Sequence, residues 1–122
     1  MNIKLTTNIG IFYNQLLQLF SSFNPIKNLR QAEINILAEI MKQNYNYRNI
    51  KEHMRRNIIF SQEIKDEMCD NLKISRDSFN NYISILRKKK VLNADNTLIK
   101  PLIIFPDNEF TFSVTFKLDK NE

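Results

Sequence analysis

The most informative stretch of the chain runs from Ser61 to Leu92 and reads SQEIKDEMCDNLKISRDSFNNYISILRKKKVL. Ser61 and Ser75 are small hydroxyl residues of the kind that cap the first turn of a helix. After Ser75, apolar side chains recur at the spacing of one helix face. They are Phe79, Tyr82, Ile83 and Leu86. The stretch therefore predicts two helices joined by a short turn at residues 73–74.

The composition limits the chemistry that the chain can perform. Its 122 residues, the length of one domain, include one glycine, Gly10, one histidine, His53, and one cysteine, Cys69. Phosphate-binding loops need several glycines, and a His/Cys metal site needs at least two such ligands. Cys69 falls on the apolar face of its helix and is expected to be a buried hydrophobe. We therefore expect no catalytic residues, no metal and no cofactor, and hence no enzyme.

Positive charge is concentrated in one part of the chain. The formal net charge is +5, and residues 73–100 alone carry seven basic and two acidic side chains. The rest of the chain is close to neutral, so the whole excess lies on the second predicted helix and its flanks. A basic face on one helix is the electrostatic pattern of a nucleic-acid-binding protein.

The N-terminal part predicts an amphipathic helix between Ile9 and Phe23, where apolar residues recur three and four positions apart. Pro25 is expected to end this helix. We assign residues 1–27 to this element, which either packs on its own domain or mediates dimerisation. The dimer, if formed, is expected to be a homodimer through this helix.

Residues 28–122 are expected to form the main domain. Asn28 and Gln31 have the spacing of a capping box, which predicts a helix from Asn28 to about Lys42. Residues 43–57 are more polar and predict a loop followed by a short helix.

The C-terminal part has a different pattern. Residues 98–105 are apolar and β-branched, and residues 106–109 (PDNE) have turn chemistry. From Phe110 to Leu118 apolar and polar residues alternate strictly, which is typical of a half-buried strand. The two runs predict a β-hairpin, with Pro101 confining the first strand to a sheet edge.

The segment LKISRDSFNNYISILRKKKVL resembles the second half of the winged helix-turn-helix DNA-binding family of bacterial and phage transcription regulators. The residues that carry the resemblance are Ile74, Ser75, Phe79, Ile83, Leu86, Lys90, Val91 and Leu92. Two features depart from that pattern: Lys90 stands where a glycine is common, and residues 43–60 are longer than the plainest version. The resemblance implies a mainly α fold with a C-terminal β-hairpin: a three-helix core plus a wing, with an extra N-terminal helix.

A recognition helix over residues 75–90 would enter the major groove of double-stranded DNA, with polar side chains near its start and basic ones near its end. The expected DNA contacts on this helix are Ser75, Arg76, Ser78, Asn80, Asn81, Ser84, Arg87, Lys88 and Lys89. The resemblance places the wing at Asp107 and Asn108. Asp77 is a mild objection, because its carboxylate would repel a phosphate.

The expected function is sequence-preferring binding of double-stranded DNA, in transcription regulation or replication. The alternative is a structural or adaptor protein of a phage particle, which would use the same fold to bind other virion or regulatory proteins. No run approaches the roughly 20 apolar residues that span a bilayer, and the N-terminus lacks a secretory signal pattern. We expect a protein of the cytoplasm, or of the host cytoplasm or virion if a phage encodes it, without membrane contact.

Overall fold

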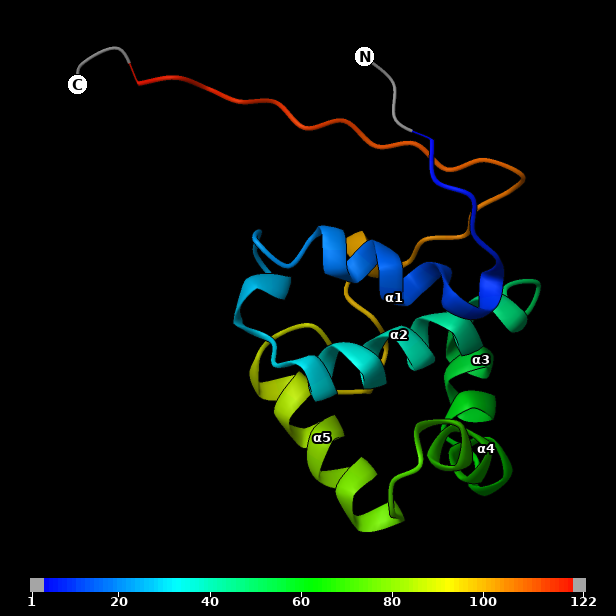
Figure 1. Ribbon diagram of the computed structural model, residues 1–122. Coiled ribbons are helices and arrows are strands. Elements are labelled where there is room, and N and C mark those ends of the chain that lie inside the picture. Colours follow the sequence, from blue (N-terminus) through cyan, green and yellow to red (C-terminus); the bar gives the residue numbers. More distant parts are fainter. Residues whose placement is uncertain (1–3, 120–122) are drawn as a thin grey trace.

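Five α-helices and two short 3₁₀ turns make up the ordered elements of the computed structural model, which describes residues 4–119 (Figure 1). The α-helices are α1 (Ile9–Leu19), α2 (Gln31–Asn46), α3 (Glu52–Ile59), α4 (Gln62–Leu72) and α5 (Arg76–Lys88). The 3₁₀ turns are η1 (Ile26–Asn28) and η2 (Lys100–Leu102). The described residues contain no β-strand, and their only bridge is an isolated antiparallel pair between Leu92 and Leu98.

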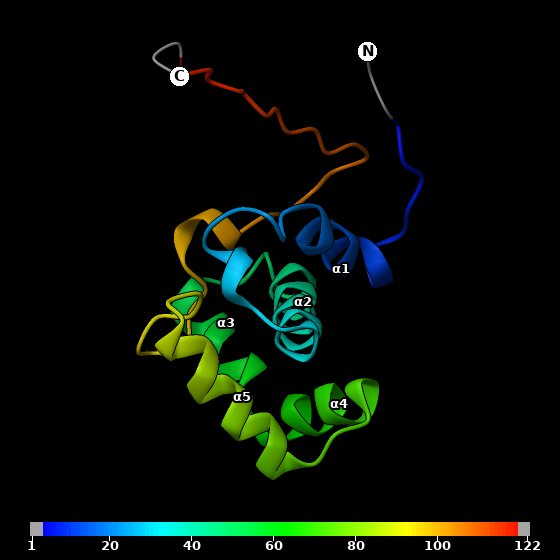
Figure 2. The same ribbon diagram turned by 60° about the vertical axis from the view of Figure 1, so that its left-hand side comes forward.

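Helix α2 is the centre of the fold, and α1, α3, α4 and α5 each pack against it (Figures 1 and 2). Its buried apolar side chains include Ile36, Leu37, Ile40 and Met41. These join side chains from the other helices in one hydrophobic cluster, which also contains Tyr13 and Leu17 of α1 and Phe79 of α5. Since burial of apolar surface is the main favourable term in folding, α2 organises the molecule.

Polar side chains on α2 also connect it to α4. The Asn71 amide donates to Glu39, with 3.0 Å between nitrogen and oxygen, and the Gln43 amide donates to Glu67 at 3.4 Å. Among residues 4–119, every buried side-chain nitrogen or oxygen atom has a hydrogen-bond partner. The buried polar residues of α2 are therefore satisfied within the fold.

The boundaries of α1 and α2 differ from those predicted. Helix α1 ends at Leu19 and does not reach Phe23. The predicted start of the second helix at Asn28 is wrong, because Asn28 belongs to η1 and α2 begins at Gln31. The carboxylate of Glu33 accepts the Arg30 backbone N–H at 3.2 Å, which supplies the reach-back contact expected from Gln31.

Helix α2 also continues past Lys42 to Asn46, into the segment expected to be a loop. This extension is stabilised by packing, because Gln43 is buried and the Tyr45 ring lies 6.4 Å from the Tyr13 ring of α1. The short helix predicted to follow the loop is α3.

The predicted pair of helices within residues 61–92 is confirmed. Ser61 caps α4, and the Ser75 side chain caps α5 by accepting the Ser78 backbone N–H at 3.1 Å. Lys73 adopts the left-handed conformation in the turn, with φ of 56°. On α5, the side chains of Phe79, Ile83 and Leu86 are buried as predicted.

The predicted C-terminal β-hairpin is wrong, and with it the winged fold class. Pro101 lies in η2, where its ring cannot donate to a strand ladder. Leu98 makes only the isolated bridge to Leu92, and Leu102 is buried from η2, so residues 98–105 do not continue as a strand. Residues 110–118 are extended but have no strand beside them in the described part of the chain.

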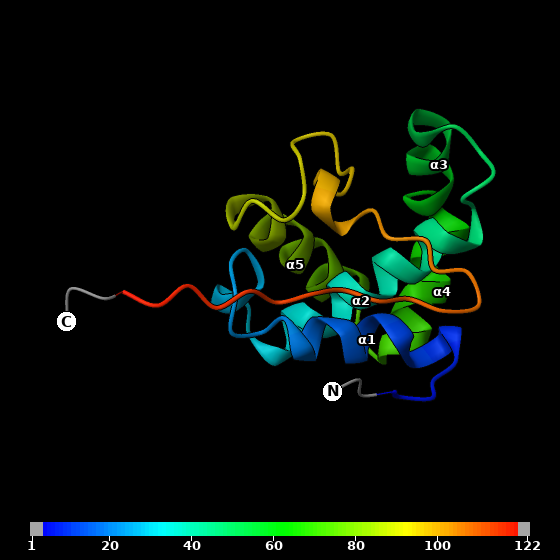
Figure 3. The ribbon, with the colours of Figure 1, turned by 90° about the horizontal axis from the view of Figure 1, so that it is seen from above.

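The C-terminal segment instead runs along the outer side of α1 and then leaves the helical body (Figure 3). The Tyr13 hydroxyl anchors its start by donating to the Ile104 carbonyl at 2.5 Å. The Phe110 ring meets the Phe12 ring edge-on at 5.6 Å between centroids, and Phe112 meets Phe20 in the same way at 4.9 Å. The apolar side chains of α1 are thus covered by α2 and, in part, by this C-terminal segment.

Candidate nucleic-acid interface

The solvent-facing side of α5 is polar. Asn80, Asn81 and Lys88 are exposed, and Ser84 is half-buried. Residues 77, 81, 84 and 88 follow the spacing of one helix face, opposite the buried face. Asn81, Ser84 and Lys88 are therefore brought together as a single surface, with Asn80 at its edge.

The N-terminal end of this surface is shaped by local hydrogen bonds. The Ser75 hydroxyl is used as the helix cap and also bonds to the Ser78 hydroxyl at 3.1 Å. Arg76 pairs with Asp66 of α4 at 2.7 Å between nitrogen and oxygen. Asp77 is exposed in the first turn, where the helix dipole favours a negative charge. Ser75 and Arg76 thus have structural partners already.

The basic run at the C-terminal end of α5 divides into two engaged and two exposed side chains. Arg87 donates to the Asn96 side chain at 2.6 Å and to the Ser84 hydroxyl at 3.2 Å. Lys89 donates to the Asn28 carbonyl at 2.9 Å and forms an ion pair with Glu33, which is buried. Lys88 and Lys90 are exposed. Lys89 therefore holds the fold together instead of projecting from the face of α5.

A small loop follows α5 and fixes Arg87. The Asn93 backbone N–H donates to the Thr97 carbonyl at 2.8 Å, which closes the loop. The Thr97 hydroxyl donates to Asp95 and lowers the pKa of that carboxyl, which also lies 3.6 Å from Arg56. The loop carries the negative charge of Asp95, so the surface beside the end of α5 is polar and not basic.

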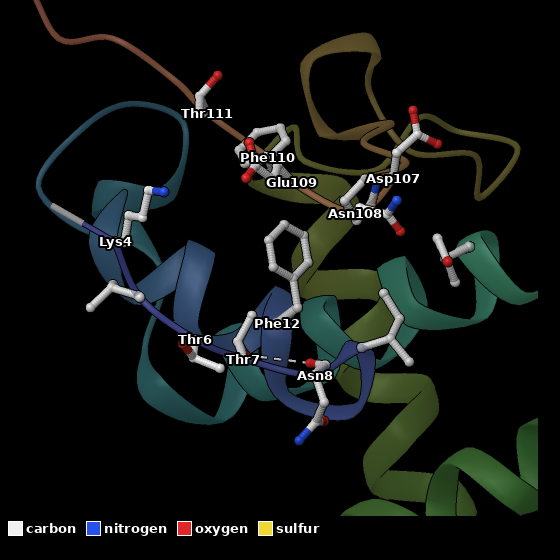
Figure 4. A pocket seen from close by; sticks show the side chains of 14 residues that line it. Lys4, Thr6, Thr7, Asn8, Phe12, Asp107, Asn108, Glu109, Phe110 and Thr111 are labelled. Atoms are coloured by element: carbon white, nitrogen blue, oxygen red, sulfur yellow. Dashed lines mark hydrogen bonds between the residues drawn. The ribbon is translucent and has the colours of Figure 1, made fainter. Parts of the chain in front are cut away.

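The residues predicted to form the wing lie elsewhere. Asp107 and Asn108 sit next to the N-terminal segment, at the rim of a hollow of about 470 Å³ between residues 4–9 and 106–111 (Figure 4). Figures 1 and 2 place this region at the end of the molecule opposite α5. The structure does not bring Asp107 and Asn108 together with the polar face of α5.

The hollow is lined by both polar and apolar residues. Leu5, Ile9, Phe12 and Phe110 contribute apolar surface to it, and Lys4 and Glu109 lie at its edge. No group of three or more His, Cys, Asp or Glu residues within residues 4–119 could hold a metal ion. Burial raises the pKa of the Cys69 thiol, which favours its protonated form.

Two exposed lysines were missing from the predicted set of DNA contacts. Lys73 lies in the turn before α5 and Lys90 directly after it, and both have positive φ, 56° and 67°. The concentration of basic residues in 73–100 is a sequence signal that could have identified Lys73 as a contact. Positive φ at lysine has no such signal in the sequence.

No helix among residues 4–119 is both long and apolar enough to cross a membrane. A scan against models of known protein families, a search of curated proteins and a search of solved structures each find no match to this chain.

Proposed function

We propose that this chain binds double-stranded DNA through α5, as a regulator of transcription or a replication-type DNA-binding protein acting in the cytoplasm. The observation that carries the proposal is the single polar face of α5, which presents Asn81, Ser84 and Lys88 from a helix-turn-helix with a well-packed opposite side. In helix-turn-helix proteins that bind DNA the second helix lies in the major groove, and a polar face of this kind suits that position.

The dimensions of α5 suit this role. Its 13 residues give a length of about 20 Å at 1.5 Å per residue. The major groove, about 12 Å wide, admits one α-helix. Asn80 and Asn81 near the start of the helix can each make a bidentate contact with adenine, whereas Lys88 near its end suits a phosphate.

Lys73 and Lys88 flank the polar face and supply its charge. Both are exposed, and among residues 4–119 neither has an ion-pair partner. Arg76 can join them at small cost, because its pair with Asp66 is largely exposed and such surface pairs are worth about 0–1 kcal/mol. Phosphate contacts of this kind position a protein on DNA without reading its sequence.

Fluorescence anisotropy of a labelled AT-rich duplex, titrated with protein at several salt concentrations, tests the proposal. We expect log affinity to fall linearly with log salt, because phosphate contacts release counterions. Absence of binding at low salt, with the fold intact, would overturn the proposal.

A matched pair of variants locates the contacts. Lys73→Asn/Lys88→Ala removes two charges beside α5, and asparagine tolerates the left-handed conformation at position 73. We expect the salt slope to fall by about 2, because each lost phosphate contact contributes about 0.9. The control, Lys4→Ala/Lys51→Ala, removes two exposed charges outside the α4–α5 unit and is expected to keep the slope.

Sequence preference depends on different residues. In duplexes selected from a random library, Asn81→Ala is expected to reduce discrimination by about 1–3 kcal/mol while leaving the salt slope unchanged. An equal loss of affinity for every duplex would show that Asn81 does not read bases.

A second candidate function is that of an adaptor between proteins, in a phage particle or a regulatory complex. The observation that favours it is the exposure of Phe116 and Leu118 in the C-terminal segment. An intact fold that fails to bind DNA and captures a defined protein through this segment would support the adaptor role.

A further inference from the structure

The backbone of the C-terminal segment is unpaired. Within the described residues, no hydrogen bond involves a backbone N–H or C=O of residues 105–118. The segment is extended and alternates apolar with polar side chains from Phe110 to Leu118. A row of free donors and acceptors on such a strand is a template for pairing with another strand.

The apolar face of the segment is only partly covered. Phe110 and Phe112 pack on α1, whereas Phe116 and Leu118 are 85% and 82% exposed. The hollow beside Phe110 is lined also by Leu5 and Phe12 and lies between residues 4–9 and 106–111 (Figure 4). The segment therefore has uncovered apolar side chains and, next to the half that packs on α1, a partly apolar recess.

The sequence of the segment is complementary to itself. If two copies pair antiparallel about Ser113, Phe110 faces Phe116 and Phe112 faces Val114 on one side of the ribbon. On the other side Glu109 faces Lys117 and Thr111 faces Thr115. Opposite charges and threonine pairs directly across two strands each stabilise a sheet.

Neighbouring registers are less favourable. Pairing about Val114 would set Glu109 opposite Asp119, two carboxylates. Pairing about Phe112 would set Phe116 opposite Asn108, so that the aromatic side chain would lose its apolar neighbour. A shift by a single residue would bring apolar side chains opposite polar ones. Pairing about Phe112 also sets Asp107 opposite Lys117, but it gives Phe116 no apolar partner. The register about Ser113 combines charge pairing on one face with an apolar partner for both Phe112 and Phe116 on the other.

We propose that two copies of this chain form a two-fold symmetric dimer in which residues 109–117 pair antiparallel about Ser113. The partner's Phe116 lies beside Phe110, on the side of the ribbon that faces α1, and covers the hollow. The interface uses the same surface on both copies, as a closed dimer requires. The proposal does not depend on DNA binding, and it assigns dimerisation to the C-terminal segment together with α1.

The mass of the full chain in solution tests the dimer. Sedimentation or light scattering is expected to give about 29 kDa, twice the 14.6 kDa of the chain. Phe116→Ser/Leu118→Ser is expected to raise the dissociation constant by about 100-fold or more, because Phe116 loses its burial against the partner's Phe110 at both ends of the ribbon. Both side chains are exposed in the single chain, so its circular dichroism and thermal unfolding under monomeric conditions stay unchanged. A monomer at all concentrations would overturn the proposal, including the case in which the segment binds a different protein.

Charge reversal tests the register. Glu109→Lys and Lys117→Glu, each alone, place like charges opposite one another twice and are expected to weaken the dimer about tenfold. The double variant Glu109→Lys/Lys117→Glu restores opposite charges and is expected to restore the dimer. Additive weakening in the double variant would overturn the register.

Disulfide cross-linking tests the symmetry axis. Paired residues in an antiparallel ribbon have Cα atoms about 4.5–5.5 Å apart, within disulfide range. Ser113→Cys is therefore expected to form a covalent dimer under mild oxidation. In Thr111→Cys the two thiols would be about 13 Å apart, so this control stays monomeric on a non-reducing gel. Equal cross-linking of both variants would overturn the proposed pairing.

Discussion

Lys89 shows how a basic residue at the end of α5 can be held within the fold. Its ammonium group meets the carboxylate of Glu33, whose side chain is 3% exposed, and the Asn28 carbonyl. Removing it leaves Glu33 buried without its charge partner, which costs far more than the loss of a surface ion pair. Lys88, one residue earlier, is exposed and has no such role.

Substitution of these two lysines is therefore expected to separate stability from DNA binding. Lys89→Ala is expected to lower the free energy of unfolding by about 1–3 kcal/mol. Lys88→Ala is expected to stay within about 0.5 kcal/mol of the parent, as surface substitutions usually do. Urea denaturation followed by circular dichroism measures both. Equal stability of the two variants would contradict the structural role of Lys89.

Cys69 gives a second prediction at a single residue. The residue is 5% exposed, and burial raises the pKa of its thiol. A cysteine in the unfolded chain ionises at about pH 8.5, and burial raises the pKa of the folded thiol above that value. The stability that this residue contributes is therefore present below that pH and is lost as pH rises through the raised pKa. We expect a thiol reagent at pH 8 to modify the native protein only as fast as it opens.

The measurement compares the rate of thiol modification in buffer with that in urea. Full reaction in urea and a slow reaction in buffer, accelerated by the destabilising Lys89→Ala substitution, are the expected results. A fast reaction of the native protein, at the rate seen in urea, would show that Cys69 is accessible.

Among the elements, α5 was the most predictable, because its cap, its turn and its buried face all lie within residues 73–88. The positions of Phe79, Ile83 and Leu86 specify which side is buried, and hence that Asn81, Ser84 and Lys88 share the other side. The fate of Lys89 could not be predicted in this way, since its partner Glu33 lies 56 residues away in the chain. Local spacing reports on one helix and not on what that helix meets.

The C-terminal hairpin failed for a related physical reason. Strict alternation from Phe110 to Leu118 indicates an extended segment with two different sides, and the segment is extended. The pattern does not say which strand lies beside it. The expected partner, residues 98–105, places Leu98 and Leu102 in the core through the turn at Pro101. Core packing thus takes up residues 98–105, the segment that was expected to pair with residues 110–118.

In the molecule as a whole, the two proposed surfaces lie at opposite ends. Figures 1 and 2 show α5 at one end and residues 110–118 at the other, with α1 and α2 between them. A dimer formed through the C-terminal segments therefore leaves both α5 faces open to solvent. If α5 binds DNA as proposed, the two α5 helices of such a dimer would contact two sets of phosphates, and the dimer would gain affinity without any new contact within each copy.

If α5 binds DNA and the C-terminal segments form the dimer, the slope of log affinity against log salt depends on both the duplex length and the oligomeric state. On a duplex long enough for two helices, the monomeric variant Phe116→Ser/Leu118→Ser is expected to show about half the salt slope of the parent, because it makes half the phosphate contacts. On a duplex too short for a second helix, the two proteins are expected to share one slope. Anisotropy titrations on both duplexes supply the four slopes. If the variant keeps the parent's slope on the long duplex, only one α5 of the dimer reaches DNA, because contacts to phosphate, not dimerisation itself, determine the slope.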